Sequence, residues 1–267
     1  MKFSVLASGS TGNVTFVETN QTKVLIDIGM SCLYVEKKLR DMEINPKDIK
    51  AVIITHTHSD HISGLRVFLK KHHPTLFITK KMYNDLKDFI YKEECVFIDG
   101  KFIIGDITVT PFSVSHDAPD TNGYILESGC SSVVYVTDTG YINSKHFDIL
   151  NNKSAYIFES NHDVKMLMDG KYQYHLKQRI ISDRGHLSNK DSSYYLSKII
   201  GKDTKYIVLA HLSKENNTPD IALNNLLNML SETNYKIDSL VASPDERTKL
   251  ITIWLKLYVL VRLKKNI

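Results

Sequence analysis

The stretch His56-Thr57-His58-Ser59-Asp60-His61 follows directly on the apolar run Ala51-Val52-Ile53-Ile54-Thr55. In an extended chain residues i and i+2 point to the same side, so the side chains of His56 and His58 can bind one metal ion. The chain then turns, and Asp60 with His61 can face a second position beside the first. Imidazole nitrogens and carboxylate oxygens in this mixture are ligands that zinc and similar ions favour. The stretch therefore predicts a metal site at the end of a buried strand.

Four other strand-like segments also end in an acid or an imidazole. They are 24–26 before Asp27, 112–115 before His116, 133–137 before Asp138, and 206–210 before His211. Taken singly, an Asp in such a place is explained as a turn or N-cap residue, and a His as a surface residue. Together they predict strand ends that converge on one edge of the sheets.

Short strand-like runs alternate with helix-like segments along the chain. Runs rich in Val, Ile, Phe and Tyr between turn residues predict strands, and apolar residues three and four apart predict helices. The expected strands are 2–7, 14–18, 23–28, 51–55, 107–114, 122–128, 132–137, 154–159, 204–210 and 236–242, and the expected helices are 31–41, 61–71, 79–90, 188–200 and 219–231. Hairpins and crossovers both occur, so we predict an α/β protein of two mixed sheets packed face to face with helices outside.

Length and composition agree with one globular domain over residues 1–249. The 267-residue chain is 42% hydrophobic and 24% charged, with a formal net charge of +4. That mild positive charge permits a nucleic-acid partner without requiring one. Three widely spaced cysteines without a CxxC pair argue against a disulfide framework and predict a reducing, cytoplasmic setting. The apolar start of the chain reaches Gly9 too soon for a secretory leader.

Residues 250–267 form a predicted tail that is first apolar and then basic. The run 250–263, LITIWLKLYVLVRL, is interrupted by Lys256 and Arg262. It is too short for a stable membrane span, which needs about 20 residues. We expect a last strand or helix packed on the core, with an interfacial anchor or an oligomer contact as the alternative. Recovery of the whole protein in the soluble fraction of cells would remove the membrane alternative.

The set formed by the HxHxDH run, Asp27, His116, Asp138 and His211 resembles the five motifs of the metallo-β-lactamase superfamily. The resemblance extends from residue 1 to about residue 244 and implies an αββα sandwich with two metal ions at the sheet edge. It assigns one metal to His56, His58 and His116, the other to Asp60, His61 and His211, and the bridging position to Asp138. It also implies that Asp27 orients ligands from behind them, as metal-binding histidines usually require.

Details of these motifs distinguish among members of the superfamily. Members with a di-iron redox centre carry Glu where this chain has His58, so His58 favours hydrolysis. Secreted β-lactamases usually lack the bridging aspartate, so Asp138 argues against that activity. The segments 8–13 (SGSTGN), 158–163 (FESNHD), 185–189 (GHLSN) and 210–214 (AHLSK) resemble the WalJ/YycJ family of Gram-positive bacteria, whose members are cytoplasmic exonucleases that act on DNA. The apolar stretch from Leu250 is a departure from that family.

Glu159 and His186 resemble the Glu and His that assist phosphodiester cleavage in RNase Z. In the mechanism that we hypothesise, Asp60 orients an attacking water between the metals and accepts its proton. His186 then protonates the departing 3′-oxygen, and Glu159 holds its tautomer and raises its basicity. The alternative is that Gly185-His186 only caps the helix that follows.

The segment 165–190 could contact nucleic acid. Tyr172, Tyr174, Lys177 and Arg179 lie among further basic residues there, and alternating cationic and aromatic side chains can hold phosphates and stack on bases. A solvated amphipathic helix explains the same pattern. The glycines of segment 8–13 are explained by turn geometry, with a contact to a terminal phosphate as the alternative.

These observations predict a metal-dependent phosphodiesterase, and the resemblance implies a DNA exonuclease with 5′→3′ polarity. The alternatives are an RNase Z-like RNA-processing nuclease, a small-molecule ester or phosphodiester hydrolase, and a protein that binds metal without turnover. No inserted arm of the RNase Z kind is evident, and 267 residues leave no room for an inserted β-CASP domain. Histidine-rich coordination favours two zinc ions per chain, and manganese or iron would also fit the carboxylates.

Overall fold

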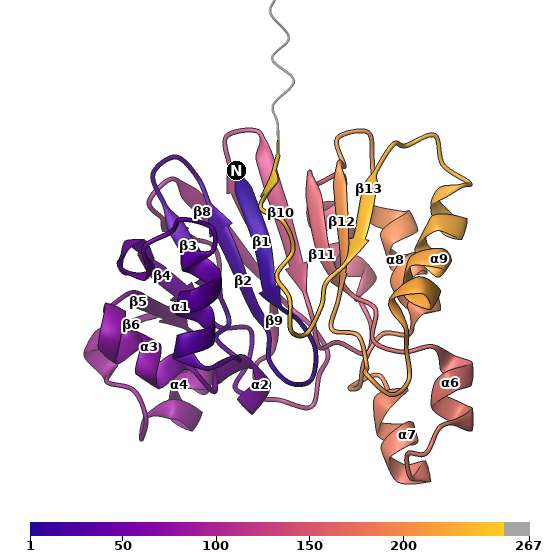
Figure 1. Ribbon diagram of the computed structural model, residues 1–267, viewed down its shortest axis with the longest axis horizontal. Coiled ribbons are helices and arrows are strands. Elements are labelled where there is room, and N and C mark those ends of the chain that lie inside the picture. The colour runs from indigo at the N-terminus through magenta and orange to yellow at the C-terminus, as the bar shows by residue number, and fades with distance from the viewer. Residues whose placement is uncertain (254–267) are drawn as a thin grey trace, which may run out of the picture.

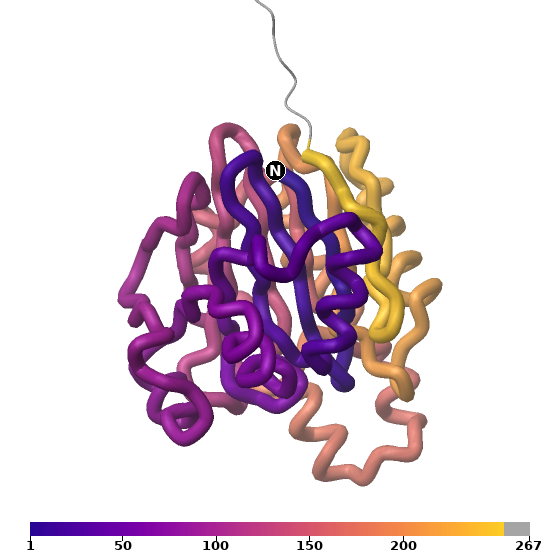
Figure 2. The backbone as a smooth tube through the Cα atoms, turned by 60° about the vertical axis from the view of Figure 1, so that its left-hand side comes forward, coloured from indigo at the N-terminus to yellow at the C-terminus, as the bar shows by residue number. Residues whose placement is uncertain are grey.

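The computed structural model describes residues 1–253, which form two seven-stranded sheets packed face to face (Figure 1, Figure 2). The strands of the first sheet are β1 (Lys2–Ala7), β2 (Val14–Glu18), β3 (Lys23–Ile26), β4 (Ala51–Ile53), β5 (Thr75–Ile78), β6 (Cys95–Phe97) and β14 (Ile251–Thr252). Those of the second are β7 (Phe102–Ile104), β8 (Ile107–Ser113), β9 (Asn122–Ser128), β10 (Ser131–Val136), β11 (Ala155–Glu159), β12 (Tyr206–Ala210) and β13 (Asp238–Val241).

Each sheet joins an antiparallel part to a parallel part. In the first sheet, with the order β14-β1-β2-β3-β4-β5-β6, the pairs from β3 onward are parallel and those before it are antiparallel. In the second, with the order β13-β12-β11-β10-β9-β8-β7, the pairs from β13 to β10 are parallel and the others antiparallel. Parallel neighbours end at the same edge of a sheet, so side chains that follow β3, β4, β10, β11 and β12 can meet.

Helices cover the outer faces of both sheets. Their bounds are α1 (Cys32–Arg40), α2 (Ser59–Ile62), α3 (Leu65–His72), α4 (Lys80–Leu86), α5 (Phe147–Leu150), α6 (Val164–Asp169), α7 (Tyr174–Ile180), α8 (Asn189–Ile199) and α9 (Pro219–Leu230), with 3₁₀ turns η1 (Pro46–Asp48), η2 (Lys92–Glu94) and η3 (Ser144–His146). Apolar residues of α1, α3 and α4 pack on the first sheet, and those of α5, α8 and α9 pack on the second. Figure 1 shows α6 and α7 projecting beyond the ends of the strands. We call residues 164–180 the α6–α7 arm.

Strand residues are buried on both faces, which explains their nearly continuous apolar sequences. In β3, Val24 and Ile26 face the core between the sheets, whereas Leu25 packs beneath the helices. In β10, Val133 and Tyr135 face the same central core, and Val134 belongs to the outer layer under α8. The predicted αββα sandwich of two mixed sheets is therefore confirmed.

Some elements differ from their predicted form. The expected helix 61–71 is split into α2 and α3, because the amide of Gly64 donates to the carbonyl of Ile28 at 2.9 Å instead of continuing the helix. The two segments approach so closely at this point that a Cβ on residue 64 would lie 2.0 Å from the Met30 carbonyl oxygen. The expected helix 79–90 ends at Leu86. The short strands β5, β6 and β7 were absent from the prediction because runs of three or four residues carry too little periodicity to distinguish them from loops.

The first four residues of the predicted C-terminal tail lie against the first sheet. Ile251 and Thr252 pair with Phe3 and Lys2 of β1, and Ile251 and Ile253 are buried in the central core. Residues 254–267 lie outside the described residues, so the domain boundary at 249 and the role of the rest of the tail stay predictions. None of the helices formed by residues 1–253 has the length and apolar character needed to cross a bilayer.

Glu36 of α1 is a buried acid held by basic side chains. Its carboxylate lies 2.6 Å from Nζ of Lys71, 2.8 Å from Nε2 of His72 and 3.0 Å from Nη2 of Arg40. The hydrogen bond from Lys71 is the largest cause that holds the pKa of Glu36 at about 2, against the opposing effect of burial. The acid is therefore ionised in the folded protein under ordinary conditions.

Replacing Glu36 with glutamine is expected to lower the free energy of unfolding at pH 7 by about 2 kcal/mol, because Lys71 and Arg40 lose a buried anionic partner. The loss is limited because the charged ends of both basic side chains remain exposed to solvent. Because folding depresses this pKa, the stabilisation is present above the ordinary value of 4.5 and is lost as the pH falls toward about 2. Urea unfolding measures the difference, with the exposed Glu232→Gln as control. Equal unfolding free energies for wild type and Glu36→Gln at pH 7 would contradict the prediction.

Candidate metal centre and active site

The predicted metal-binding residues come together at one edge of the two sheets. They follow different strands: His56, His58, Asp60 and His61 follow β4, His116 follows β8, Asp138 follows β10, and His211 follows β12. Asp27, Asp138 and His211 have left-handed backbones with φ of 59°, 56° and 56°. This conformation is uncommon for residues other than glycine, and such backbone strain concentrates at functional sites. In each case it turns the chain sharply where a strand ends.

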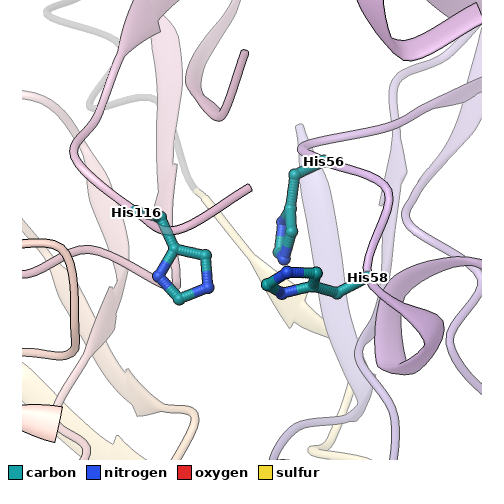
Figure 3. A group of neighbouring side chains, drawn as sticks. All are labelled: His56, His58 and His116. Carbon is teal, nitrogen blue, oxygen red and sulfur yellow. The ribbon is translucent and has the colours of Figure 1, made fainter. Parts of the chain in front are cut away.

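The first cluster consists of His56, His58 and His116. Each offers a ring nitrogen, and the three nitrogens lie within 4.8 Å of one another. Figure 3 shows His116 facing His56 and His58 across a shared space. Three imidazoles that converge in this way can serve as the ligand set of a single transition-metal ion.

The second cluster consists of Asp60, His61, Asp138 and His211. Nε2 of His61 lies 3.0 Å from Oδ2 of Asp138, and Nε2 of His211 lies 3.3 Å from its Oδ1. Oδ2 of Asp60 lies 3.6 Å from both of these histidine nitrogens. Oδ1 of Asp138 is also 4.0 Å from Nε2 of His116, so this carboxylate faces both clusters.

The donor atoms of both clusters fit divalent metal ions. Nε2 of His56, Oδ2 of Asp138 and Nε2 of His211 are buried without a hydrogen-bond partner. Polar atoms left in that state cost about 1–3 kcal/mol each, so a bound ion would remove a real penalty. Ligands held 2.0–2.2 Å from one tetrahedral ion lie roughly 3.3–3.6 Å apart. The distances from His211 to Asp60 and Asp138 fall in that range.

The other ring nitrogens of three histidines are held by neighbouring groups. Nδ1 of His61 lies 2.8 Å from Oδ2 of Asp27, Nδ1 of His116 lies 3.2 Å from the carbonyl oxygen of Gly185, and Nδ1 of His211 lies 3.2 Å from Oε1 of Glu159. An acceptor at Nδ1 keeps the proton there and leaves the Nε2 lone pair free for a metal. Asp27, which the resemblance predicts to orient ligands, contacts His61 through this Nδ1 atom.

Asp27 also fixes the strand end that carries the histidines. Its Oδ1 accepts a hydrogen bond from the amide of Thr55 at 2.8 Å, and its Oδ2 accepts one from Oγ1 of Thr55 at 2.8 Å. Oγ1 of Thr55 lies 3.1 Å from Nδ1 of His56 as well. One buried carboxylate thereby orients residues of both clusters.

Replacing Asp27 with asparagine is expected to weaken metal binding by about 10–100-fold, because His61 loses the anionic acceptor that makes its Nε2 a stronger ligand. Asparagine can still accept from the Thr55 amide and tolerates the left-handed backbone. Titration of metal-free protein against a competing chelator measures the effect. Thermal unfolding of both metal-free proteins checks that the fold is intact, and wild-type affinity in Asp27→Asn would refute the prediction.

Glu159 and His186 form a second pair beside the metal clusters. Nδ1 of His186 lies 2.7 Å from Oε1 of Glu159, the same oxygen that contacts His211, and Oε2 of Glu159 accepts from the Thr139 amide at 2.8 Å. Burial would raise the pKa of Glu159, but His186 and His211 hold it at about 2. Burial alone would lower the pKa of His186, but the Glu159 carboxylate raises it above its ordinary value. The pair therefore favours an imidazolium at His186.

A cavity of about 210 Å³ opens beside this pair and the second cluster. His186 and His211 line it, so Nε2 is the nitrogen that His186 can present to a ligand there. The cavity is also lined by His116, Asp117 and Gly185, by the polar residues Ser10, Asn161 and Ser213, and by Tyr172, Leu176, Arg179 and Ile180 from the α6–α7 arm. The arm thus forms one wall of the space next to the metal centre.

The four residues predicted to contact nucleic acid lie in different settings. Tyr172 and Arg179 line the cavity. Nζ of Lys177 donates to the carbonyl oxygens of Met168 and Gly170 at 2.6 and 2.7 Å, which ties α7 to the end of α6. Tyr174 is 72% exposed and does not border the cavity. The structure therefore brings two of the four next to the metal centre.

Several residues of the site were missed by the sequence analysis. Nδ2 of Asn13 lies 3.0 Å from Nε2 of His61, and Oγ of Ser8 accepts from the amide of His211 at 2.8 Å. The turn 8–13 therefore braces the second cluster, a role that the sequence signalled only through the motif SGSTGN. Asp117 was missed too, although it directly follows His116, because one acid in a loop carries no pattern of its own.

Comparisons with known proteins place this fold and site in a family. The family model described as "Metallo-beta-lactamase superfamily" matches residues 7–211 of this chain. Exodeoxyribonuclease YycJ of Bacillus anthracis is 36% identical over 260 residues, which are 94% of this chain and 97% of that protein. Exodeoxyribonuclease WalJ of Streptococcus pneumoniae is 38% identical over 263 residues, which are 94% of this chain and 98% of that protein.

A solved structure agrees at the level of the fold. The metallo-beta-lactamase fold protein YhfI from Bacillus subtilis has a TM-score of 0.69 at 16% identity, over 92% of this chain and 98% of that chain. The predicted family is confirmed, and with the clusters of His and Asp it implies that the protein holds divalent metal ions. The chain belongs to the metallo-beta-lactamase superfamily.

Proposed function

We propose that this protein is a metal-dependent exodeoxyribonuclease that hydrolyses DNA from its 5′ end. The observation that carries the proposal is the position of the Glu159–His186 pair, which shares an oxygen with the ligand His211 and borders the same cavity. That arrangement supports a proton donor next to a dinuclear site, a combination that assists departure of the leaving oxygen in phosphodiester hydrolysis. The names of the two relatives, which this chain matches over 94% of its length, support DNA as the substrate.

His56, His58 and His116 would hold one ion, Asp60, His61 and His211 the other, and Asp138 would bridge them. When bound, two divalent ions neutralise the phosphodiester charge and make water a nucleophile near neutral pH. Asp60 is proposed to orient the attacking water and accept its proton, and the 21% exposure of its side chain at the edge of the cluster supports this role.

His186 is proposed to protonate the departing 3′-oxygen from Nε2. Its Nδ1 proton remains on the hydrogen bond to Glu159, which stabilises the imidazolium before transfer and the correct tautomer after it. The buried Glu159 keeps its negative charge throughout. Release of the alkoxide as an alcohol removes the main barrier to its departure.

The cavity wall is proposed to receive the end of the DNA strand. Tyr172 can stack on a base, and Ser10, Asn161 and Ser213 offer uncharged hydrogen-bonding groups to a sugar or phosphate. Arg179 adds positive charge at the same wall. Tyr174 and Lys177 belong to the same arm and are proposed to contact DNA only outside the cavity.

The metal and the compartment are parts of the same proposal. Five histidines favour zinc, and the carboxylates of Asp60 and Asp138 also suit manganese or iron. Elemental analysis of protein purified without added metal identifies the native ion. All three cysteines are free thiols, which supports a reducing compartment and hence the cytoplasm.

One assay separates the proposed activity from its alternatives. Duplex DNA labelled at the 5′ or the 3′ end, structured RNA and cyclic nucleotides are incubated with the protein under the same metal ions. We expect early release of the 5′ label as a mononucleotide. Early release of the 3′ label would overturn the polarity, cleavage of RNA alone would indicate an RNase Z-like enzyme, and turnover of cyclic nucleotides alone would indicate a small-molecule phosphodiesterase.

A further inference from the structure

We propose that Asp117 supplies an additional carboxylate ligand to the cluster of His56, His58 and His116, and that Arg179 holds this carboxylate in place. The inference rests on the proposed dinuclear site, because it concerns the same ions. It does not depend on which substrate the enzyme cleaves. Asp117 is outside the seven ligands that the motifs assign.

The position of one oxygen carries the proposal. Oδ1 of Asp117 lies 3.3 Å from Nε2 of His116 and 3.7 Å from Nε2 of His58. These separations are close to the roughly 3.3–3.6 Å expected between ligands of one tetrahedral ion. The same oxygen is buried and has no hydrogen-bond partner. A carboxylate oxygen without a hydrogen-bond partner, beside ring nitrogens of two histidines of this cluster, is in a suitable position for a metal ligand.

Arg179 occupies the other oxygen of the same carboxylate. Its Nε donates to Oδ2 of Asp117 at 2.6 Å, and its Nη2 contacts that oxygen as well. With Oδ2 held in this way, only Oδ1 is left to face the histidines. Carboxylates that bind metals are commonly oriented by such a hydrogen bond to their second oxygen. Arg179 belongs to α7, so the α6–α7 arm contributes to the metal centre through Asp117.

An ordinary surface ion pair does not explain this geometry. In such a pair the carboxylate oxygens stay in contact with water, and the two charges attract each other only weakly. Here Oδ1 is shielded from solvent and turned away from Arg179 toward the cluster. Adding a carboxylate to three imidazoles should also raise the affinity for manganese more than for zinc, because manganese prefers oxygen ligands.

Chelator-competition titrations of metal-free protein, without DNA, test the proposal with Mn²⁺ and with Zn²⁺. In Asp117→Asn we expect the Kd for Mn²⁺ at one of two sites to rise by about tenfold or more, with a smaller rise for Zn²⁺. Asp120→Asn is the matched control, because Asp120 is 27% exposed against 25% for Asp117 and pairs with Lys81 rather than with a histidine. The visible spectrum of the Co²⁺ form should change in Asp117→Asn and not in Asp120→Asn.

Arg179→Gln tests the second part of the proposal. We expect it to weaken Mn²⁺ binding at the same site by less than Asp117→Asn does. If Arg179 acts only through Asp117, the double variant should bind no more weakly than Asp117→Asn alone. Additive losses would overturn the positioning role of Arg179.

The remaining outcomes are distinguishable from one another. Asp117→Asn could bind two ions with the same Kd values and the same Co²⁺ spectrum as the wild-type protein. That result would overturn the ligand role of Asp117 and leave the proposed nuclease intact. Fewer than two ions in the wild-type protein would overturn both proposals. Two ions, weakened Mn²⁺ binding in Asp117→Asn and no DNA hydrolysis would support the ligand and refute the nuclease.

Discussion

Replacing His186 with alanine is expected to lower kcat for DNA hydrolysis by about 10²–10⁴-fold, the usual contribution of a positioned general acid. The leaving 3′-oxygen would then depart without a proton, whereas the donor atoms of both metal clusters would stay in place. Steady-state kinetics on a single DNA substrate, with metal content measured in parallel, checks the result. We expect two ions per chain in both proteins.

The matched control is His175→Ala, which removes an exposed imidazole from α7 at a position that does not line the cavity. It should retain wild-type kcat. If His186→Ala keeps its ions and its full kcat, the contact with Glu159 is structural and His186 only caps the turn before α8. If His186→Ala instead loses an ion, its effect on kcat would be assigned to metal binding.

Replacing Asp138 with asparagine is expected to reduce the bound metal from two ions to one or none and to lower kcat by about 10³-fold or more. The two oxygens of Asp138 face both clusters, at 3.0 Å from His61, 3.3 Å from His211 and 4.0 Å from His116. Two neighbouring dications repel each other, and the bridging negative charge offsets that repulsion. Losing this charge neutralisation would raise the activation free energy by several kcal/mol, which corresponds to a fall in kcat of about 10³-fold.

Elemental analysis after dialysis, combined with DNA hydrolysis at fixed metal concentration, measures both effects. Asparagine tolerates the left-handed backbone of this position, so the fold should persist. Asp120→Asn is the control, because Asp120 has a similar φ of 59° and lies outside both clusters. An Asp138→Asn protein with two ions and wild-type kcat would show that the clusters are independent of this carboxylate.

The parts of the site that follow from local backbone geometry were predictable. His56 and His58 share a side because an extended chain alternates its side chains, and Asp60 with His61 follows because the strand ends there. Asp27, His116, Asp138 and His211 were recognisable because each follows an apolar strand. Parallel strands end at one edge, so a list of strand ends already implied a common site. The alternation of apolar runs likewise sufficed to predict two sheets covered by helices.

The roles of Glu159 and His186 came from resemblance to a known motif. Their residue types allowed a cap or a surface position equally well. Only the folded chain shows that one oxygen of Glu159 contacts both His186 and His211. That contact depends on the register between β11 and β12, which no local pattern specifies.

By itself the sequence determined the family, the sandwich and the convergence of the motif residues, because hydrophobic period and strand-end side chains are local properties of the chain. Only the tertiary structure decided that Asn13 braces His61 and that Arg179 reaches Asp117, which lies 62 positions away in the sequence. These contacts join segments whose separation is set by sheet order and helix packing. No pattern within a single segment encodes such a distance, and for that reason they became visible only in the folded chain.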